Sequence, residues 1–143
     1  MTVTELIEAA RVAGEPQQLC AAIPYAQFLG LSLERDDAGL MCRMRASEKI
    51  IGNPTLPAIH GGVIGALLEA AALFHLVWEG DSVALPKTIN MSIDYLRSAG
   101  PADTFARGII TRQGRRVANV RAEAWQTSRA KLVAAAHGHF LIG

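Results

Sequence analysis

A chain of 143 residues has room for one hydrophobic core and not for two, so we expect a single domain. Half of the residues are hydrophobic, and 14 basic residues nearly balance 13 acidic ones, which excludes a strong overall field for nucleic acid or an anionic membrane surface. Cys20 and Cys42, the two cysteines, lack the spacing of a disulfide framework or a zinc site, and the first residues do not resemble a secretory signal, so we expect a cytoplasmic protein.

The first part of the chain contains two candidate helices. Residues 4–13 have an amphipathic pattern, with Thr4 as the expected cap. A second short helix is expected over residues 17–23, after which Pro24 turns the chain. We therefore treat residues 1–27 as an N-terminal helical extension of the domain.

A hairpin and an irregular segment are expected next. Residues 31–35 and 40–46 have the composition of strands, and the turn-forming residues between them predict a hairpin. Residues 48–60 include glycine, asparagine and two prolines, so we expect no regular structure there.

The segment from Val63 to Val77 predicts a central helix. Twelve of its fifteen residues are apolar and they lie on all sides of a helical wheel, which indicates a helix buried all round. Because the segment is too short to span a bilayer, we expect no transmembrane helix.

Four strand-like stretches follow, at residues 88–95, 105–112, 118–125 and 132–142. The first and third alternate apolar and polar residues with a period of two, as half-buried strands do. The connections are short, which predicts antiparallel pairing of neighbours in a four-stranded meander. The predicted fold class is therefore α+β, with a hairpin, a buried helix and a meander that wraps it.

Two glycines at the start of the central helix suit an oxyanion site. Gly61 and Gly62 expose backbone N–H groups in the positive field of a helix N-terminus, with no side chain to block a ligand. Such donors can stabilise the negative charge that develops on a carbonyl oxygen during nucleophilic attack. The alternative interpretation is that the two glycines only turn the chain tightly into the helix.

Glu69 is the second candidate catalytic residue. A carboxylate within so apolar a helix is costly unless it is paired or functional. It could act as a general base on water or attack a carbonyl carbon directly. The alternative is a structural carboxylate bonded to a polar partner.

The residues from His60 to Glu69, HGGVIGALLE, resemble the H-G-G-x6-[DE] motif of hotdog-fold thioesterases related to PaaI and to 4-hydroxybenzoyl-CoA thioesterase. The segments Asn90–Arg97 and Gly114–Ala118 resemble that family's next strand and hairpin. The resemblance covers about residues 28–142 and implies a hotdog fold, with an antiparallel curved sheet around one long helix. Together with the N-terminal helical extension we expect a single hotdog domain over residues 1–143. The resemblance also implies hydrolysis of an acyl-CoA or aroyl-CoA to the free acid and CoA, without a metal or other cofactor.

The spacing of the two candidate groups favours a site shared between subunits. Gly62 and Glu69 are seven residues apart, which places them on one helix face but about 10 Å apart along its axis. A nucleophile must lie within about 3.5 Å of the reacting centre. We therefore infer a composite site in which the glycines of one subunit face Glu69 of another. The resemblance implies the same homodimer, and we expect a homotetramer built as a dimer of dimers.

Several further residues are candidates for substrate binding. Arg112, Arg115 and Arg116 surround a hairpin glycine and could hold the phosphates of CoA, although such clusters are often solvated turns. His60 is expected to line the site or to cap the helix. The family often has an asparagine six residues before this histidine, but here Asn53 lies one residue earlier than that.

The remaining candidates concern the acyl group and a polar helper for Glu69. The start of the strand after the central helix, where relatives place such a helper, offers Lys87, Thr88 and Asn90. The acyl pocket is expected to be drawn from Phe74, Trp78, Met91 and their neighbours. His137 and His139 share one strand face without a third ligand in the pattern, so no metal site is expected.

Two other functions compete with hydrolysis. A non-catalytic hotdog protein could bind acyl-CoA in the same pocket. A hotdog hydratase or dehydratase is disfavoured, because the sequence lacks an Asp/His pair arranged like the motif of those enzymes.

Overall fold

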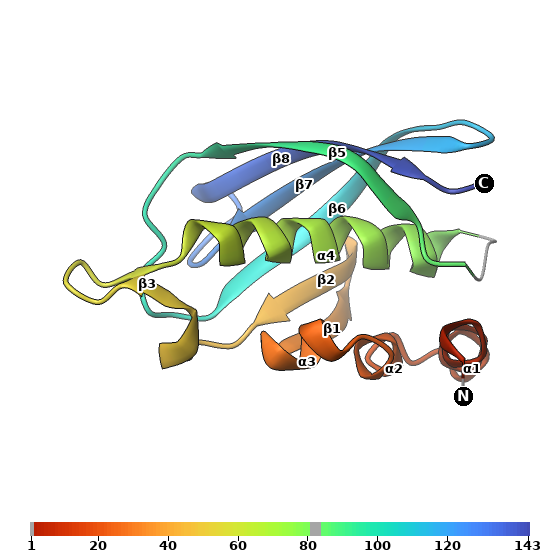
Figure 1. Cartoon of the computed structure of the whole chain (residues 1–143), viewed down its shortest axis with the longest axis horizontal. Coiled ribbons are helices and arrows are strands. Elements are labelled where there is room, and N and C mark those ends of the chain that lie inside the picture. The colour runs from red at the N-terminus through yellow and green to blue at the C-terminus, as the bar shows by residue number, and fades with distance from the viewer. Residues whose placement is uncertain (1, 81–83) are drawn as a thin grey trace.

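A long helix lies against a curved antiparallel sheet in the computed structural model, which describes residues 2–80 and 84–143 (Figure 1). The helices are α1 (Val3–Ala13), α2 (Gln18–Ala21), α3 (Pro24–Phe28) and α4 (Gly61–Glu79), with a short 3-10 helix, η1, at Glu48–Ile50. The strands of the 6-stranded sheet are β1 (Leu31–Asp36), β2 (Gly39–Met44), β5 (Lys87–Tyr95), β6 (Thr104–Gln113), β7 (Val117–Trp125) and β8 (Leu132–Leu141). A separate hairpin of β3 (Ile51–Asn53) and β4 (Ala58–Ile59) projects beyond the start of α4.

The strand order is β1-β2-β6-β7-β8-β5, which corrects the predicted four-stranded meander. Strands β6, β7 and β8 do form a meander, but β5 pairs with β8 and does not touch β6. The link of residues 96–103 carries the chain from one edge of the sheet back to β6, where β2 also pairs. With β5 at one edge and the β1–β2 hairpin at the other, the sheet is wide enough to curve around α4 from both sides.

The core lies between α4 and the inner face of the sheet. The predicted alternation in β7 is confirmed, because Ala118, Val120, Ala122 and Ala124 are all buried. Many inward residues of the sheet are alanines, and they let α4 approach closely. Gly108 marks one close contact, since a Cβ there would lie 3.0 Å from the carbonyl oxygen of Ala71.

One face of α4 is only partly covered, so the prediction of a helix buried all round is wrong for a single chain. The half-exposed residues recur every three or four positions and form an open stripe: Val63, Ala66, Glu69, Ala70 and Leu73. By length and composition this 19-residue helix could cross a membrane, but half of its most apolar window is buried inside the domain. Figure 1 is viewed from the open side of α4, opposite the sheet.

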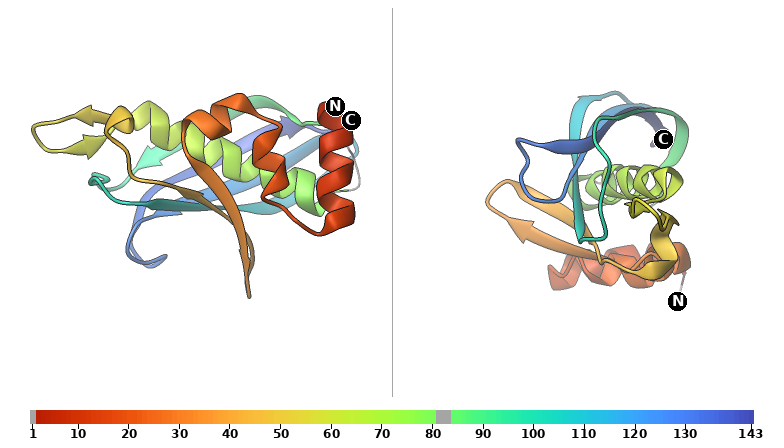
Figure 2. Two further views of the ribbon diagram at one scale, coloured as in Figure 1. Left: turned by 90° about the horizontal axis from the view of Figure 1, so that it is seen from below. Right: turned by 90° about the vertical axis from the view of Figure 1, so that its left-hand side faces the viewer.

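The N-terminal elements close the side of α4 beneath the open stripe (Figure 2). Thr2, and not Thr4, caps α1 through a capping box. The Thr2 hydroxyl oxygen accepts from the Glu5 N–H, and the Glu5 carboxylate accepts from the Thr2 N–H. The helix predicted for residues 17–23 is only the short α2. Pro24 begins α3 in place of a turn, as proline does at a first helical position.

The segment before α4 also has more structure than expected. Residues 48–60 contain η1 and the β3–β4 hairpin, where no regular structure was predicted. Asn53 supports this hairpin, since its side-chain oxygen accepts hydrogen bonds from the backbone N–H groups of Thr55 at 3.0 Å and Leu56 at 3.3 Å.

Candidate active site

His60 is the cap of α4. Its Nδ1 accepts a hydrogen bond from the Gly62 N–H at 2.9 Å, and its carbonyl oxygen accepts from the N–H groups of Val63 and Ile64. Its own N–H donates to the Ile50 carbonyl at 2.9 Å. A Cβ on the neighbouring Gly52 would lie 2.8 Å from the His60 Cα, so a glycine is needed to seat this residue. The structure therefore places His60 both at the start of the helix and beside the two glycines.

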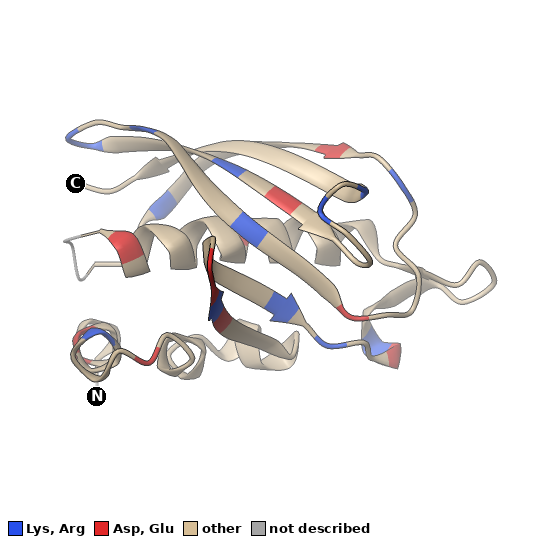
Figure 3. Cartoon of the chain, turned by 180° about the vertical axis from the view of Figure 1, so that it is seen from behind, with Lys and Arg blue, Asp and Glu red and all other residues tan. Residues whose placement is uncertain are grey.

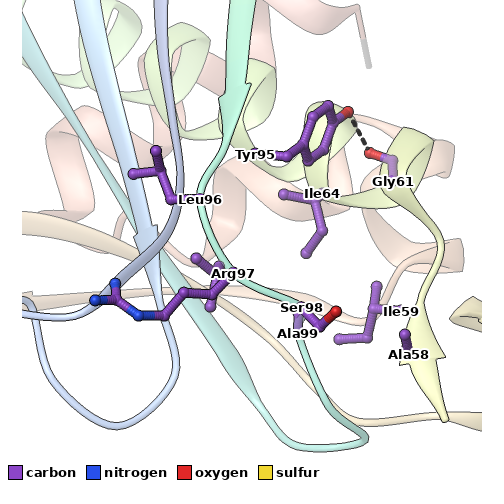
Figure 4. Close-up of a pocket in the computed structure, with 10 residues that line it drawn as sticks. Ala58, Ile59, Gly61, Ile64, Tyr95, Leu96, Arg97, Ser98 and Ala99 are labelled. Atoms are coloured by element: carbon purple, nitrogen blue, oxygen red, sulfur yellow. Dashed lines mark hydrogen bonds between the residues drawn. The ribbon is translucent and has the colours of Figure 1, made fainter. Parts of the chain in front are cut away.

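The peptide group between Gly61 and Gly62 is bonded at both ends. The Tyr95 hydroxyl donates to the Gly61 carbonyl oxygen at 2.8 Å (Figure 4), while the Gly62 N–H is held by His60. Within the described residues, the Gly61 N–H has no hydrogen-bond acceptor. Sequence reasoning missed Tyr95, although its position two residues after Ile93 on the inward face of β5 was a usable signal.

A pocket of about 400 Å³ opens beside this peptide group. Arg97 is its single charged lining residue, and the Arg97 guanidinium donates to the Leu132 carbonyl at 2.8 Å and is turned away from Gly61 (Figure 4). The pocket is lined by parts of β4, α4, β5, the link that follows β5, and β8: Ala58, Ile59, Gly61, Ile64, Tyr95, Leu96, Arg97, Ser98, Ala99 and Val133.

Glu69 is half-buried on the open stripe of α4 and is paired with Thr88. The Thr88 hydroxyl donates to Glu69 Oε2 at 2.9 Å. A β-bulge in β5 makes this contact possible, because Thr88 pairs with Phe140 while Asn90 already pairs with His139. The extra residue between them turns Thr88 toward α4, to the same side as the buried Phe140. Of the three candidate helpers at this strand start, the structure thus brings Thr88 to Glu69.

Asn90 lies on the opposite, outer face of the sheet. Its side-chain oxygen is 2.7 Å from Nδ1 of His139. The pairing register continues this polar row across the sheet from His139 to Asn119 and from Asn119 to Arg112. Asn90 is therefore not brought to Glu69, but to the neighbourhood of the arginine cluster.

The three arginines border a second region of the outer face. A pocket of about 520 Å³ is lined by Arg112, Arg115 and Arg116 together with Asn119 and His139. Figure 3 shows the positive charge gathered on this β6–β7 hairpin. Asn53 is far from it, in the hairpin that projects beyond the start of α4.

An apolar pocket of about 90 Å³ lies beside Glu69, which is its single charged lining residue. Phe74 was expected there and is present, whereas Trp78 and Met91 are not part of the lining. The N-terminal segment supplies half of the walls, which sequence reasoning missed because no local pattern links this segment to α4. The lining consists of Ile23, Tyr25, Ala26, Leu29 and Leu31 from the N-terminal side and of Ala66, Glu69, Ala70, Leu73 and Phe74 from α4.

The two candidate groups remain apart in one chain. Gly61 lines the first pocket and Glu69 lines the apolar one, and neither pocket contains both. Their separation of eight residues corresponds to about 12 Å along a helix axis. A single chain therefore does not assemble an oxyanion donor and a carboxylate around one reacting atom.

The cysteines are unsuited to nucleophilic catalysis. Both are buried free thiols, and burial raises the pKa of Cys20 to about 11. Burial also raises the pKa of Cys42, with a further contribution from Cys20. Within residues 2–80 and 84–143, no group of three His, Cys, Asp or Glu side chains is arranged to hold a metal ion.

Known proteins resemble this chain over most of its length. Residues 56–133 match the model of the thioesterase superfamily. A protein from Chromobacterium violaceum is 37% identical, with 97% of each chain covered and a TM-score of 0.80. A phenylacetic acid degradation-related protein from Ralstonia eutropha JMP134 is 27% identical over 94% of this chain and 98% of its own, with a TM-score of 0.77.

A more distant structure shares the fold. A Bacillus halodurans protein, solved with CoA, is 20% identical over 99% of this chain and 91% of its own, with a TM-score of 0.77. No curated protein matches the sequence.

Proposed function

Because the chain belongs to the thioesterase superfamily, we propose that it hydrolyses an acyl-CoA or aroyl-CoA to the free acid and CoA. The predicted hotdog fold and the resemblance to PaaI-like thioesterases are both confirmed by the comparisons. The relative that was solved with CoA supports CoA as the carrier of the acyl group.

The observation that carries this proposal is the position of Glu69. Its carboxylate stands at the wall of an apolar pocket, and Thr88 orients one carboxylate oxygen while Oε1 is left for the reaction. From there it takes a proton from water that attacks the thioester carbon, or it attacks that carbon itself to give a mixed anhydride. Either route breaks the C–S bond, and water supplies the second oxygen of the free acid.

The glycine end of α4 supplies the oxyanion donors in this proposal. The Gly61 N–H has no acceptor within the described residues, and the Gly62 N–H is bonded to the exposed side chain of His60. Both lie in the positive field of a 19-residue helix. A thioester oxygen at this position would gain the Gly61 N–H, a donor that needs no reorganisation during the reaction.

We further propose that the site is completed by a second copy of the chain. The open stripe of α4 adjoins β5, an edge strand that exposes 52% of Ile89 and 55% of Tyr95. Unpaired edges and apolar surface favour association. An antiparallel partner helix would bring its glycines to Glu69 of the first subunit, giving two equivalent sites in a homodimer. A tetramer as a dimer of dimers is the larger assembly that we expect.

The two remaining pockets are assigned to the two ends of the substrate. Arg112, Arg115 and Arg116 are proposed to hold CoA phosphates, and Asn90 lies close to them through His139. Asn53 contributes less, because its oxygen is engaged in the β3–β4 turn.

The acyl group is proposed to occupy the apolar pocket beside Glu69. In a single chain this pocket has a volume of about 90 Å³, less than the cavity of about 150 Å³ that holds benzene in another protein, and on this ground we propose a short aliphatic chain in preference to an aryl ring.

A panel of acyl-CoA thioesters tests the reaction directly. The purified protein is assayed with acetyl-, butyryl-, hexanoyl-, benzoyl- and phenylacetyl-CoA, and released CoA is trapped by a chromogenic thiol reagent. We expect turnover of at least one thioester, with short aliphatic chains preferred. Tight binding of an acyl-CoA in calorimetry without release of thiol from any substrate would contradict the proposal and identify a non-catalytic acyl-CoA-binding protein.

A further inference from the structure

The peptide group between Gly61 and Gly62 is held from both sides by side chains of other residues. The Tyr95 hydroxyl donates to its carbonyl oxygen at 2.8 Å, and His60 Nδ1 accepts from its N–H at 2.9 Å. Because a peptide group is planar, fixing the direction of the carbonyl also fixes the direction of the N–H on the opposite side. The two bonds therefore set the orientation of one proposed oxyanion donor.

The Tyr95 bond is not required to satisfy a buried polar group. In an α-helix the carbonyl of residue 61 already accepts from the N–H of residue 65, so the tyrosine adds a second hydrogen bond to it. Tyr95 is also 55% exposed, and its hydroxyl could reach water instead. The ring packs directly over these two glycines, since a Cβ on Gly61 would lie at van der Waals distance from the ring, 3.6 Å, and one on Gly65 would lie 3.7 Å from the hydroxyl.

We infer that Tyr95 is a positioning residue of the oxyanion site, and that His60 holds the Gly62 N–H until a thioester oxygen takes its place. This inference rests on the proposed thioesterase function. A donor on the carbonyl oxygen polarises the whole peptide group and strengthens the opposite N–H as a donor. Since the hydroxyl is engaged with Gly61, Tyr95 acts through the peptide and does not itself bind the substrate.

The side chain of His60 is suited to be displaced from the Gly62 N–H by the substrate oxygen. Its side chain is exposed, and with Nδ1 as the acceptor its ring is the neutral form that carries the proton on Nε2. Rotation of the ring frees the Gly62 N–H without disturbing the backbone bonds that anchor His60 at the start of α4. The exchange replaces a neutral acceptor with a developing oxyanion, which forms the stronger hydrogen bond.

The kinetic test removes only the hydroxyl. In Tyr95→Phe we expect kcat to fall about 5- to 20-fold with KM within about twofold, because the lost contact orients a donor that matters most in the transition state. The matched control is Thr111→Val, which removes another exposed hydroxyl-to-carbonyl bond, from Thr111 Oγ1 to the Asn119 carbonyl at 3.1 Å. The control is expected to leave kcat unchanged. An unchanged kcat in Tyr95→Phe, or a rise in KM alone, would overturn the inference.

A spectroscopic test does not depend on turnover. In protein labelled with ¹⁵N-glycine, His60→Ala defines the resonance of a Gly62 amide without its acceptor. Tyr95→Phe is expected to shift this resonance part of the way in the same direction, while Thr111→Val leaves it in place. An unmoved Gly62 resonance in Tyr95→Phe would contradict the positioning role. Failure of the wild-type protein to hydrolyse any thioester would instead count against the proposed function, so the two failures are distinguishable.

Discussion

The glycine end of α4 and its middle offer different chemistry. Around Gly61 the chain presents backbone N–H groups and a pocket whose single charged residue, Arg97, is turned away. Around Glu69 it presents a carboxylate and apolar walls. The first region offers donors that can stabilise negative charge, and its pocket has no carboxylate in its lining. The second region offers a carboxylate but has no backbone oxyanion donor of the glycine type in its lining. In the proposed function each region is half of a hydrolytic site, so changes in the two should affect the reaction differently.

The largest effect is expected from Glu69→Gln, which keeps the shape of the side chain but removes its basicity. We expect kcat to fall by about 10²- to 10⁴-fold, as when a general base is lost. The measurement is release of CoA thiol under saturating substrate. The control is Glu79→Gln at the exposed end of the same helix, which should stay within about twofold of the wild type. Near wild-type turnover in Glu69→Gln would show that the Glu69 carboxylate is neither the base nor the nucleophile.

Thr88→Val tests the carboxylate region alone, because it removes the hydrogen bond that orients Glu69. The valine keeps the branched shape but cannot donate to Glu69 Oε2, where Thr88 now lies at 2.9 Å. A hydrogen bond to a charged group contributes about 1.5–3 kcal/mol, so kcat/KM should fall by about 10- to 100-fold. Ser92→Ala, on the same strand, is the control and should have no effect. A loss of equal size in Ser92→Ala would show that the strand as a whole, and not the contact with Glu69, is responsible.

Ile23→Ala tests the N-terminal wall of the apolar pocket. Removing three carbons enlarges the pocket, so the ratio of kcat/KM for hexanoyl-CoA to that for butyryl-CoA should rise by about 10-fold, since one methylene changes selectivity by about 10-fold or more. Val12→Ala, a 90% exposed position in α1, is the matched control. If chain-length preference is the same in both variants, the acyl group lies elsewhere.

The smallest effect is expected at His75, which belongs to neither half of the site. Burial lowers the pKa of this histidine, and Arg107 lowers it further while Glu79 opposes the shift. Below pH about 6.5 the unfolded chain therefore binds a proton that the folded chain does not, and the free energy of unfolding falls as the pH drops toward the folded pKa. In urea unfolding, the wild type should lose more stability than His75→Gln between pH 7.5 and 5.5, with kcat unchanged in the variant. Equal losses would contradict this assignment.

The parts of the site that depend on local sequence could be predicted, and the parts that depend on distant contacts could not. The two glycines and Glu69 lie within one helix, and His60 is its cap. The apolar pattern and the start of this helix could be recognised in the sequence. Thr88 reaches Glu69 because of a bulge near the start of β5. A bulge cannot be recognised from the alternation of apolar and polar residues in the sequence. Tyr95 meets Gly61 across 34 residues of chain.

The position of β5 shows the same limit at the level of the fold. Its alternation predicted a strand, but alternation does not reveal which neighbour a strand chooses. Pairing with β8 places β5 at the edge of the sheet opposite the β1–β2 hairpin, and this depends on contacts distant in the sequence. The open stripe on α4 was likewise hidden, because the apolar surface that we propose to pack against another copy of the chain has the same composition as a core surface.

Mixing two inactive variants tests most directly the claim that each active site combines the glycines of one subunit with Glu69 of the other. Glu69→Gln and Gly61→Val proteins are unfolded together, refolded at equal concentrations and assayed for thioester hydrolysis. A mixed dimer has one site with both groups intact, so we predict recovery of about a quarter of wild-type activity, because about half of the dimers are mixed and each has one of two sites. No recovery above the separately refolded variants, in a preparation shown to contain mixed dimers, would contradict the shared site.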